Sequence, residues 1–360
     1  MDEPGLFEKE GMMKKINVGF IGNGKSTNRY HAPFLLDRPE TFSIRKIYSR
    51  DHAHDAWEEI EGVEYVPDVN DVLNDPQIDL VVVATRHDTH YEFARQAIEA
   101  GKNTLVEKPF VMREAQAREL FELAKEKGVL LQGYQNRRFD SDFLTLQNVI
   151  ESGKLGTLME VESHYDYYRP EIPEGISTYS RESSYVFGHA CHTIDQVLAL
   201  FGSPKRAVYD VRSLLGKGRM NDYFDIDFFY EEPLKVSIKS SYFRVKGRPK
   251  FVAYGTKGMF IKEEEDRQEA DLKRFYLPCG HPDFGKDGPQ DYGTLIYYDD
   301  EGKYHEEKVV SVDGSYAMFY DALYETLVNK KAPLVRPEQT IELVRYLEAA
   351  CESLEKSAGR

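Results

Sequence analysis

The chain has 360 residues, of which 41% are hydrophobic, and it carries a formal net charge of −15. This length favours two domains over one, and the negative charge argues against binding to nucleic acid or to an anionic membrane, because phosphate groups would be repelled. No apolar run approaches the roughly 20 residues of a membrane span. Cys191, Cys279 and Cys351 are widely spaced and give neither a disulfide framework nor a metal-binding spacing. We therefore expect a cytoplasmic protein without a nucleic-acid or membrane partner.

The N-terminus is acidic and polar, unlike a signal peptide, and we expect residues 1–12 to form an extension outside the fold. Strands and helices alternate from residue 13 to about residue 135, which indicates a Rossmann domain with a doubly wound parallel sheet. The expected strands are 16–21, 43–48, 63–66, 79–85, 103–107 and 129–134, and the clearest helices run from Asp88 or Thr89 to Gly101 and from Arg113 to Lys127.

After residue 150 the pattern changes to alternating apolar and polar residues, clearest at 235–239, which indicates a sheet with one wet face. Residues 136–360 are therefore predicted to form a second, α+β domain with an open, mostly antiparallel sheet and helices on one face. The acidic run 262–266 is interpreted as a solvated loop. The expected strands are 157–165, 206–213, 223–230, 234–242, 250–255 and 294–298, and the expected helices are 191–201, 317–329 and 337–357.

A glycine turn follows the first strand and favours a loop that holds a dinucleotide pyrophosphate. Lys25 can add positive charge there. The third position of the glycine fingerprint is Thr27, whose extra bulk predicts that the helix stands slightly off the sheet. The residues expected to contact the cofactor in this loop are Gly22, Asn23, Gly24, Lys25, Ser26 and Thr27.

The same stretch, from Gly19 to Ser26, also matches the Walker A pattern of a P-loop enzyme. That interpretation needs a loop beginning at Gly19 and a second apolar strand that ends in an aspartate for magnesium. Residues 80–85 end without one. A P-loop phosphotransferase is therefore the weaker alternative.

The residues after the second strand decide which nicotinamide is preferred. An acidic residue there selects NAD, whereas an arginine suits the 2′-phosphate of NADP. Ser49 and Arg50 can bind a phosphate, and Asp51 follows them. We predict a preference for NADP(H), with NAD(H) possible because of Asp51.

Glu107-Lys108-Pro109 follows the fifth strand, at the sheet edge where open α/β sheets bind ligands. Oxidation of an alcohol requires a base that takes the hydroxyl proton. A lysine can serve as this base where burial or a neighbouring cation lowers its pKa. Lys108 is the candidate, and the alternative interpretation is a surface lysine before a proline turn.

A second group of candidates opens the helix 191–201. His192 and Asp195 lie one turn apart on the same helix face. His192 is a candidate partner of Lys108, and Asp195 is a candidate to orient either of them. The spacing His189-x-x-His192-x-x-Asp195 also resembles a metal site, but no third cluster of ligands is evident, and we predict no metal.

Two runs rich in polar and aromatic residues, 134–140 and 163–170, offer donors and acceptors for a polyhydroxylated substrate. The alternative is packing between domains or subunits. The candidates for substrate binding are Asn136, Arg137, Tyr165 and Arg169, with His192.

The chain resembles the family of glucose–fructose oxidoreductase, inositol dehydrogenase and rhizopine catabolism proteins, Gfo/Idh/MocA, and within it the NADP-type scyllo-inositol dehydrogenases. The resemblance covers residues 13–358. It rests on Gly22-x-Gly24, Tyr30-His31-x-Pro33, Gly101-Lys102-Asn103 through Glu107-Lys108-Pro109, Tyr134-Gln135-Asn136-Arg137-Arg138, Asp166-Tyr167-Tyr168-Arg169-Pro170 and His192-x-x-Asp195.

The resemblance implies a Rossmann domain followed by an α/β domain whose open sheet forms homodimers or homotetramers. It implies that Lys108 is the catalytic lysine and His192 its partner. Many relatives carry an aspartate four residues before this histidine, where the present chain has Gly188. The residues that the resemblance implies on the nicotinamide side of the cofactor are Thr85, His87, His90 and Glu107.

The leading hypothesis is an NADP(H)-dependent oxidoreductase that acts on a secondary alcohol of a polyol or sugar, with a scyllo-inositol-like ring as the first expectation. A non-catalytic NADP-binding regulator that senses sugars is the other alternative on the same fold. The departure at Gly188 keeps that alternative open.

Overall fold

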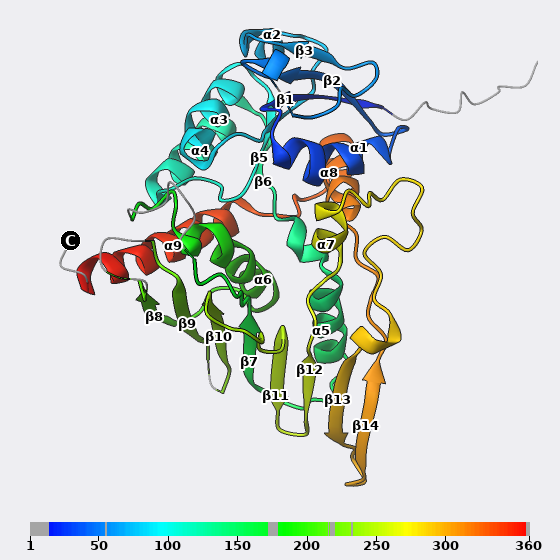
Figure 1. The fold of residues 1–360 in the computed structure, drawn as a ribbon, viewed down its shortest axis with the longest axis vertical. Helices are drawn as coiled ribbons and strands as arrows, with labels where there is room; N and C mark the ends of the chain where they lie inside the picture. Colours follow the sequence, from blue (N-terminus) through cyan, green and yellow to red (C-terminus); the bar gives the residue numbers. More distant parts are fainter. Residues whose placement is uncertain are drawn as a thin grey trace, which may run out of the picture.

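The computed structural model describes residues 14–54, 56–171, 179–214, 216, 220–231 and 233–357. The extension expected over residues 1–12 lies outside the described residues. Two sheets form the molecule, a parallel sheet at one end and a larger sheet at the other, with helices between them (Figure 1).

Six parallel strands form the first sheet, in the spatial order β3-β2-β1-β4-β5-β6. This is the strand order of a dinucleotide-binding Rossmann fold. Each strand begins and ends within two residues of its predicted bounds, so the predicted parallel sheet is confirmed. The strands are β1 (Ile16–Ile21), β2 (Phe42–Tyr48), β3 (Glu64–Val66), β4 (Leu80–Val83), β5 (Asn103–Val106) and β6 (Leu131–Gly133).

The helices of this domain end where glycine permits a left-handed backbone. Gly128 follows α4 with a φ of 67°, and Gly101 follows α3 with a φ of 73°, a conformation that side chains with a Cβ disfavour. The helical segments are η1 (Ser26–His31), α1 (Ala32–Leu36), η2 (His52–His54), α2 (Asn70–Leu73), η3 (His87–Thr89), α3 (His90–Glu99), α4 (Glu114–Lys127) and η4 (Asn136–Phe139).

Eight strands form the second sheet, in the order β14-β13-β12-β11-β7-β10-β9-β8. Only β7 and β10 pair in parallel, so the sheet is mostly antiparallel, as predicted. The strands are β7 (Leu158–His164), β8 (Arg206–Arg212), β9 (Tyr223–Phe229), β10 (Lys235–Ser241), β11 (Phe251–Gly255), β12 (Gly258–Lys262), β13 (Gly293–Tyr298) and β14 (Tyr304–Val309).

The sequence patterns did not predict β12 and β14. Only residues 256–257 separate β12 from β11. The predicted strand ended at Gly255, and no second strand was predicted so soon after it. β14 is an edge strand, and its exposed Glu306, Glu307 and Lys308 hide the alternation of a half-buried strand. Charged side chains are common on edge strands because they prevent pairing with other chains.

Helices cover one face of this second sheet, as expected. Ile194 of α6 and Leu347 of α9 share a core with Ile226 and Phe228 of β9. α8 packs elsewhere, because its Tyr320 joins the core of the parallel sheet. The C-terminal part of the chain therefore completes both cores. The remaining helices are α5 (Ser141–Glu151), η5 (Val186–Ala190), α6 (Cys191–Phe201), α7 (Gln268–Lys273), η6 (Pro289–Asp291), α8 (Ala317–Asn329) and α9 (Pro337–Ser357).

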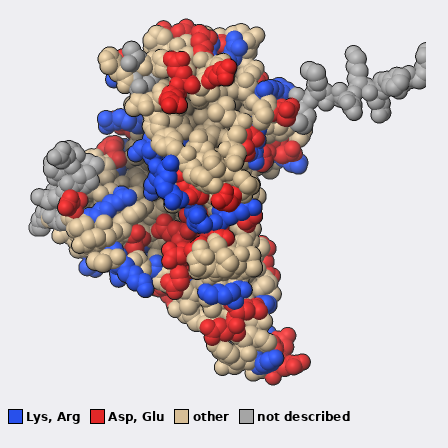
Figure 2. Space-filling model, turned by 45° about the vertical axis from the view of Figure 1, so that its right-hand side comes forward, with Lys and Arg blue, Asp and Glu red and all other residues tan. Residues whose placement is uncertain are grey.

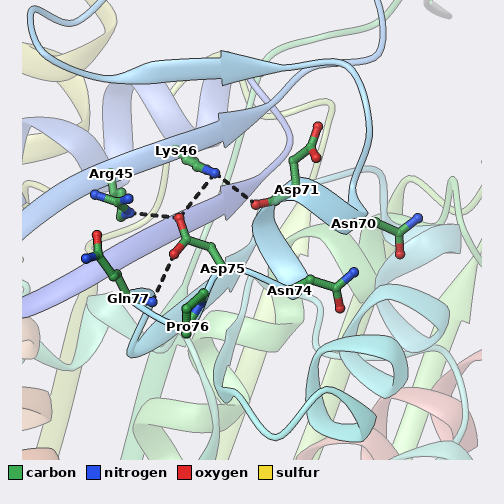
Figure 3. Close-up of a pocket in the computed structure, with 8 residues that line it drawn as sticks. All are labelled: Arg45, Lys46, Asn70, Asp71, Asn74, Asp75, Pro76 and Gln77. Carbon is green, nitrogen blue, oxygen red and sulfur yellow. Dashed lines mark hydrogen bonds and ion pairs between the residues drawn. The ribbon is translucent and has the colours of Figure 1, made fainter.

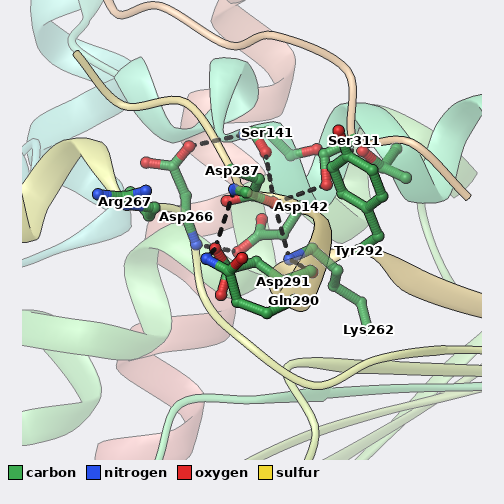
Figure 4. A network of polar contacts seen from close by, with 12 residues as sticks. Ser141, Asp142, Lys262, Asp266, Arg267, Asp287, Gln290, Asp291, Tyr292 and Ser311 are labelled. Atoms are coloured by element: carbon green, nitrogen blue, oxygen red, sulfur yellow. Dashed lines mark hydrogen bonds and ion pairs between the residues drawn. The ribbon is translucent and has the colours of Figure 1, made fainter. Parts of the chain in front are cut away.

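The acidic run 262–266 is only partly the solvated loop that the sequence indicated, because residues 263–265 are exposed whereas the residues at its two ends are buried (Figure 4). Lys262 is the buried last residue of β12, and its Nζ lies 2.9 Å from a carboxylate oxygen of Asp287. Asp266 is also buried, and its carboxylate accepts a hydrogen bond from the backbone N–H of Ser141 at 2.8 Å. A charge can be buried only where it is paired or hydrogen-bonded, and a single sequence does not show these distant partners.

A polar surface pocket lies near the amino ends of the parallel strands, beside β2 and α2 (Figure 3). Its charged side chains bind one another. Asp75 accepts a hydrogen bond from Arg45 at 2.8 Å and pairs with Lys46 at 3.1 Å. Because ligands of this fold bind at the carboxyl ends of the strands, we do not take this pocket as the active site.

None of the helices in the described part of the chain is long and apolar enough to cross a membrane. Acidic and basic side chains are interspersed on the face shown in Figure 2. That face therefore offers no extended basic patch for a phosphate backbone.

Candidate active site

The glycine turn after β1 is closed by the threonine that replaces the third glycine. Gly22 has a φ of 112°, and a Cβ there would lie 2.6 Å from the carbonyl oxygen of Ala84. The buried Thr27 hydroxyl donates a hydrogen bond to the carbonyl of Gly22 at 2.6 Å. The next segment, η1, is a π-helical turn. Its wider spacing gives Thr27 room while the hydroxyl holds the turn in place.

The space around this turn fits a dinucleotide. A Cβ at Gly24 would meet no other atom within 4 Å, so the backbone there faces open space. Ser26 and Lys25 line the same cavity as Lys108. Backbone N–H groups at a helix start and a nearby ammonium group are the donors that a pyrophosphate requires. Within the loop, Asn23 accepts a hydrogen bond from the Asn28 amide at 2.9 Å.

Gly19 excludes the P-loop interpretation. It lies inside β1, which continues to Ile21, so no loop begins there. A Cβ at this position would lie 2.7 Å from Val72, which shows that Gly19 is a packing residue of the sheet.

The residues after β2 include an exposed arginine. Ser49 is buried, and its backbone N–H donates to the carbonyl of Val66 at 3.0 Å. Arg50 is exposed, and its guanidinium has no hydrogen-bond or ion-pair partner within the described residues. The Asp51 carboxylate lies 2.7 Å from Nδ1 of His54.

A cavity of about 200 Å³ lies at the carboxyl edge of the parallel sheet and is lined by residues from both domains. Its lining combines residues after β5 and β7 with residues of η4, η5, α6 and α7. The lining residues are Lys25, Ser26, Tyr30, Glu107, Lys108, Asn136, Arg137, Tyr165, Tyr167, His189, His192, Glu269 and Tyr316.

Glu107 is the first residue after β5, and its buried carboxylate contacts neighbouring groups of the protein. It accepts a hydrogen bond from the backbone N–H of Lys108 at 2.6 Å and lies 3.2 Å from Nε2 of His31. Nδ1 of His31 lies 2.6 Å from the hydroxyl of Tyr320. Burial opposes ionisation of Glu107, but His31 and Lys108 outweigh it and lower the pKa of Glu107 to about 2. Glu107 is therefore ionised. It also lines the cavity, and its place on the nicotinamide side of the cofactor stays a prediction.

This ionised carboxylate predicts a specific acid sensitivity. Because its pKa in the folded protein lies below the ordinary 4.5, its contribution to stability is complete above pH 4.5 and is lost as the pH falls toward 2. The full contribution is roughly 3 kcal/mol. We expect the melting temperature of the wild type to fall more steeply than that of Glu107→Gln between about pH 5 and about pH 3. Parallel melting curves for the two proteins would contradict this, and Glu99→Gln on the exposed face of α3 is the matched control.

One side of the cavity contains an arginine that two carboxylates hold. Arg137 pairs with Asp140 at 3.1 Å and with Glu269, and its guanidinium lies 5.3 Å from the ring centre of Tyr165. The Tyr165 hydroxyl also donates to Glu269 at 3.2 Å. Glu269, from α7, was not predicted, because no motif surrounds it. Of the predicted substrate residues, Asn136, Arg137 and Tyr165 line the cavity.

His192 and Asp195 lie one turn apart on α6 but have different surroundings. His192 lines the cavity, and its Nδ1 is buried without a hydrogen-bond partner in the described part of the chain. The buried Asp195 carboxylate instead accepts two hydrogen bonds from Arg138, each 2.8 Å long. The expected role of Asp195 in orienting His192 or Lys108 is therefore replaced by a structural ion pair. Burial and the nearby charges of Lys108 and Arg137 lower the pKa of His192 well below its usual range.

Three further predicted residues lie outside the cavity. Both ring nitrogens of the buried His90 face backbone carbonyls, those of Pro109 at 2.9 Å and Thr85 at 3.2 Å, so this histidine holds the chain around the site. Nδ1 of His87 lies 3.4 Å from the carbonyl of Glu182. Arg169 is exposed and lies over the ring of Tyr167 at 4.3 Å.

Known proteins resemble this chain over almost its whole length. The protein named Uncharacterized oxidoreductase YhhX, from Escherichia coli strain K12, is 43% identical over 345 residues, which cover 95% of this chain and 98% of that protein. The crystal structure of a probable oxidoreductase yhhX superposes with a TM-score of 0.88 at 43% identity and covers 94% of this chain and 96% of that one. The scyllo-inositol 2-dehydrogenase (NADP(+)) IolW, from Bacillus subtilis strain 168, is 33% identical over 344 residues, which cover 94% of this chain and 93% of that protein.

Both halves of the chain also match family models. Residues 16–135 match the oxidoreductase family with an NAD-binding Rossmann fold, and residues 143–261 match the GFO/IDH/MocA C-terminal domain. The match of both models, together with the sheet order and the glycine turn, leads to one conclusion: the chain belongs to the Gfo/Idh/MocA family of NAD(P)-dependent oxidoreductases.

Proposed function

We propose that the protein transfers a hydride between NADP(H) and a secondary alcohol or ketone of a polyol or sugar, with a scyllo-inositol-like ring as the first candidate. The observation that carries this proposal is the cavity that brings Lys108 and His192 together with Asn136 and Arg137. A relative that is 33% identical is named as a scyllo-inositol dehydrogenase that uses NADP+, which supports the same class of substrate.

The roles follow from the chemistry of each side chain. In the oxidation direction, Lys108 takes the hydroxyl proton and His192 hydrogen-bonds the same oxygen. A nicotinamide bound beside the glycine turn would supply the hydride acceptor. Asn136 and Tyr165 offer donors and acceptors to the remaining hydroxyl groups, and Glu269 offers an acceptor. Fixing a rigid ring between these groups contributes much of the rate through orientation.

The first experiment follows reduction of NADP+ by absorbance with a panel of inositol isomers and aldoses, with NAD+ in parallel. Turnover with a cyclic polyol is the expected result. Binding of NADP+ without turnover of any compound would favour the non-catalytic regulator. Absence of both binding and turnover would contradict the proposal.

Preference for NADP(H) is tested separately at Arg50. We expect Arg50→Ala to weaken NADP+ binding roughly 10–100-fold, the loss of one charge-assisted contact, and to leave NAD+ binding unchanged. Asp51 is already engaged by His54, which supports this assignment. The measurement is a fluorescence titration of both cofactors, with Arg118→Ala on the exposed face of α4 as control. Equal losses for the two cofactors would contradict the assignment.

We also propose that the protein forms a homodimer or homotetramer through the open face of the second sheet. Exposed Tyr254 and Tyr298, on β11 and β13, support a contact there. Large exposed apolar side chains that cluster on one surface mark interaction sites. Sedimentation velocity at micromolar concentration that detects only a monomer would contradict this.

We propose the cytoplasm as the site of action. All three cysteines are free, and Cys279 is exposed, which supports a reducing compartment. Cell fractionation that recovers the protein from an oxidising compartment would contradict this.

A further inference from the structure

His189 is a cavity residue that the mechanism above does not use. His189 lies in η5, three residues before His192, and lines the same cavity as Lys108. Its ring is surrounded by aromatic rings, with centroid distances of 5.8 Å to Tyr165 and 5.1 Å to Tyr167. The rings leave the imidazole little freedom to turn.

The hydroxyl of Tyr242, just after β10, contacts Nδ1 of His189, and Nε2 lies 3.4 Å from the same hydroxyl. Tyr242 is itself fixed. Its ring stacks on Tyr185 at a centroid distance of 3.7 Å, and its backbone N–H donates to the carbonyl of Asp222 at 3.1 Å. The hydroxyl is therefore held beside one nitrogen of the imidazole.

A tyrosine hydroxyl that donates to Nδ1 selects one tautomer of a neutral imidazole. Burial raises the pKa of Tyr242, so its hydroxyl keeps a proton that it can donate to Nδ1. Burial, followed by the charges of Lys108, Arg169, Arg137 and Lys273, lowers the pKa of His189 well below its usual range, so the ring is neutral. A neutral imidazole whose Nδ1 accepts a hydrogen bond carries its proton on Nε2.

We propose that His189 is a catalytic hydrogen-bond donor and that Tyr242 is its positioning residue, an inference that rests on the proposed function. Nε2–H of His189 donates to the reacting oxygen. During oxidation, the O–H proton passes to Lys108, the C–H bond breaks with its electron pair as hydride to the nicotinamide, and the C=O bond forms. His189 neither gains nor loses a proton in this step. Its hydrogen bond strengthens as negative charge develops on the oxygen.

The kinetic test compares four variants of the full chain with the polyol that the wild type oxidises best. We expect His189→Leu to lower kcat on the order of 10²-fold, as loss of one preorganised donor does. We expect His189→Gln to recover part of the loss, since its amide N–H can replace Nε2–H.

We expect Tyr242→Phe to lower kcat about 10-fold, because the donor remains but its tautomer is no longer selected. KM and NADP+ affinity should stay within about twofold. Tyr185→Phe is the matched control, because it removes a hydroxyl without a hydrogen-bond partner in the described part of the chain. Wild-type kcat in Tyr242→Phe, or equal losses in His189→Gln and His189→Leu, would overturn the proposal.

A second readout does not depend on turnover. Nitrogen-15 NMR of histidine-labelled protein, with His189 assigned from His189→Gln, distinguishes the two neutral tautomers. The proposal requires the Nε2–H form in the wild type and a mixture in Tyr242→Phe, and an Nδ1–H form in the wild type would overturn it. If the wild type turns over no substrate, the proposed function fails first, and the tautomer measurement still shows whether Tyr242 orients His189.

Discussion

Replacing Lys108 by alanine is expected to lower kcat about 10²–10⁴-fold, the range that loss of a positioned proton acceptor typically produces. The hydroxyl proton then has no acceptor at the carboxyl edge of β5, because the carboxylate of Glu107 is already bound by His31 and by the Lys108 backbone. NADP+ affinity should stay within about twofold, since the glycine turn and Arg50 remain. Steady-state kinetics and a cofactor titration on the same preparations measure both quantities.

Lys108→Arg separates proton transfer from charge. Arginine keeps the positive charge but stays protonated in proteins. We therefore expect Lys108→Arg to be nearly as inactive as Lys108→Ala. Recovery of activity by arginine would show that the site needs a cation rather than a base, and near-normal turnover of Lys108→Ala would remove Lys108 from the mechanism.

Replacing Asp195 by alanine is expected to destabilise the protein while the folded fraction retains its activity. The change leaves the buried Arg138 guanidinium without its two 2.8 Å hydrogen bonds to the carboxylate. Breaking a buried pair by removing one partner costs about 3–5 kcal/mol, which lowers the melting temperature on the order of 10 °C. Arg138 also donates to the carbonyl of Leu334 at 2.8 Å, so the loss loosens the junction of η4, α6 and the loop before α9.

The measurement is thermal unfolding followed by circular dichroism, together with kcat at a temperature below both transitions. Glu99→Ala is the control, because its ion pair with Arg95 is exposed and its loss should leave the melting temperature nearly unchanged. A large loss of kcat in Asp195→Ala without a change in the melting temperature would restore a catalytic role to this carboxylate.

Strands with clear local signals could be predicted from the sequence. The apolar run of β4 and the glycines after α3 and α4 mark the parallel sheet, because burial on both faces and left-handed turns depend on the residues themselves. β14 could not be recognised in this way, since a charged edge strand is held mainly by its hydrogen bonds to β13. The burial of Lys262 could not be predicted either, because its ion-pair partner, Asp287, is distant in the sequence.

The cavity residues also differ in whether local sequence or distant contacts place them. Spacing and residue type are local properties, and they indicate that Lys108 follows a buried parallel strand and that Gly22 lies at a turn which glycine favours. They also place Asn136, Arg137 and His192 beside the ends of elements. Packing is needed to show that Asp195 binds Arg138, that Glu269 from α7 reaches Arg137, and that Tyr242 contacts His189. These contacts join residues separated by dozens of positions, and which partner a buried charge or hydroxyl finds depends on how the two sheets and their helices pack.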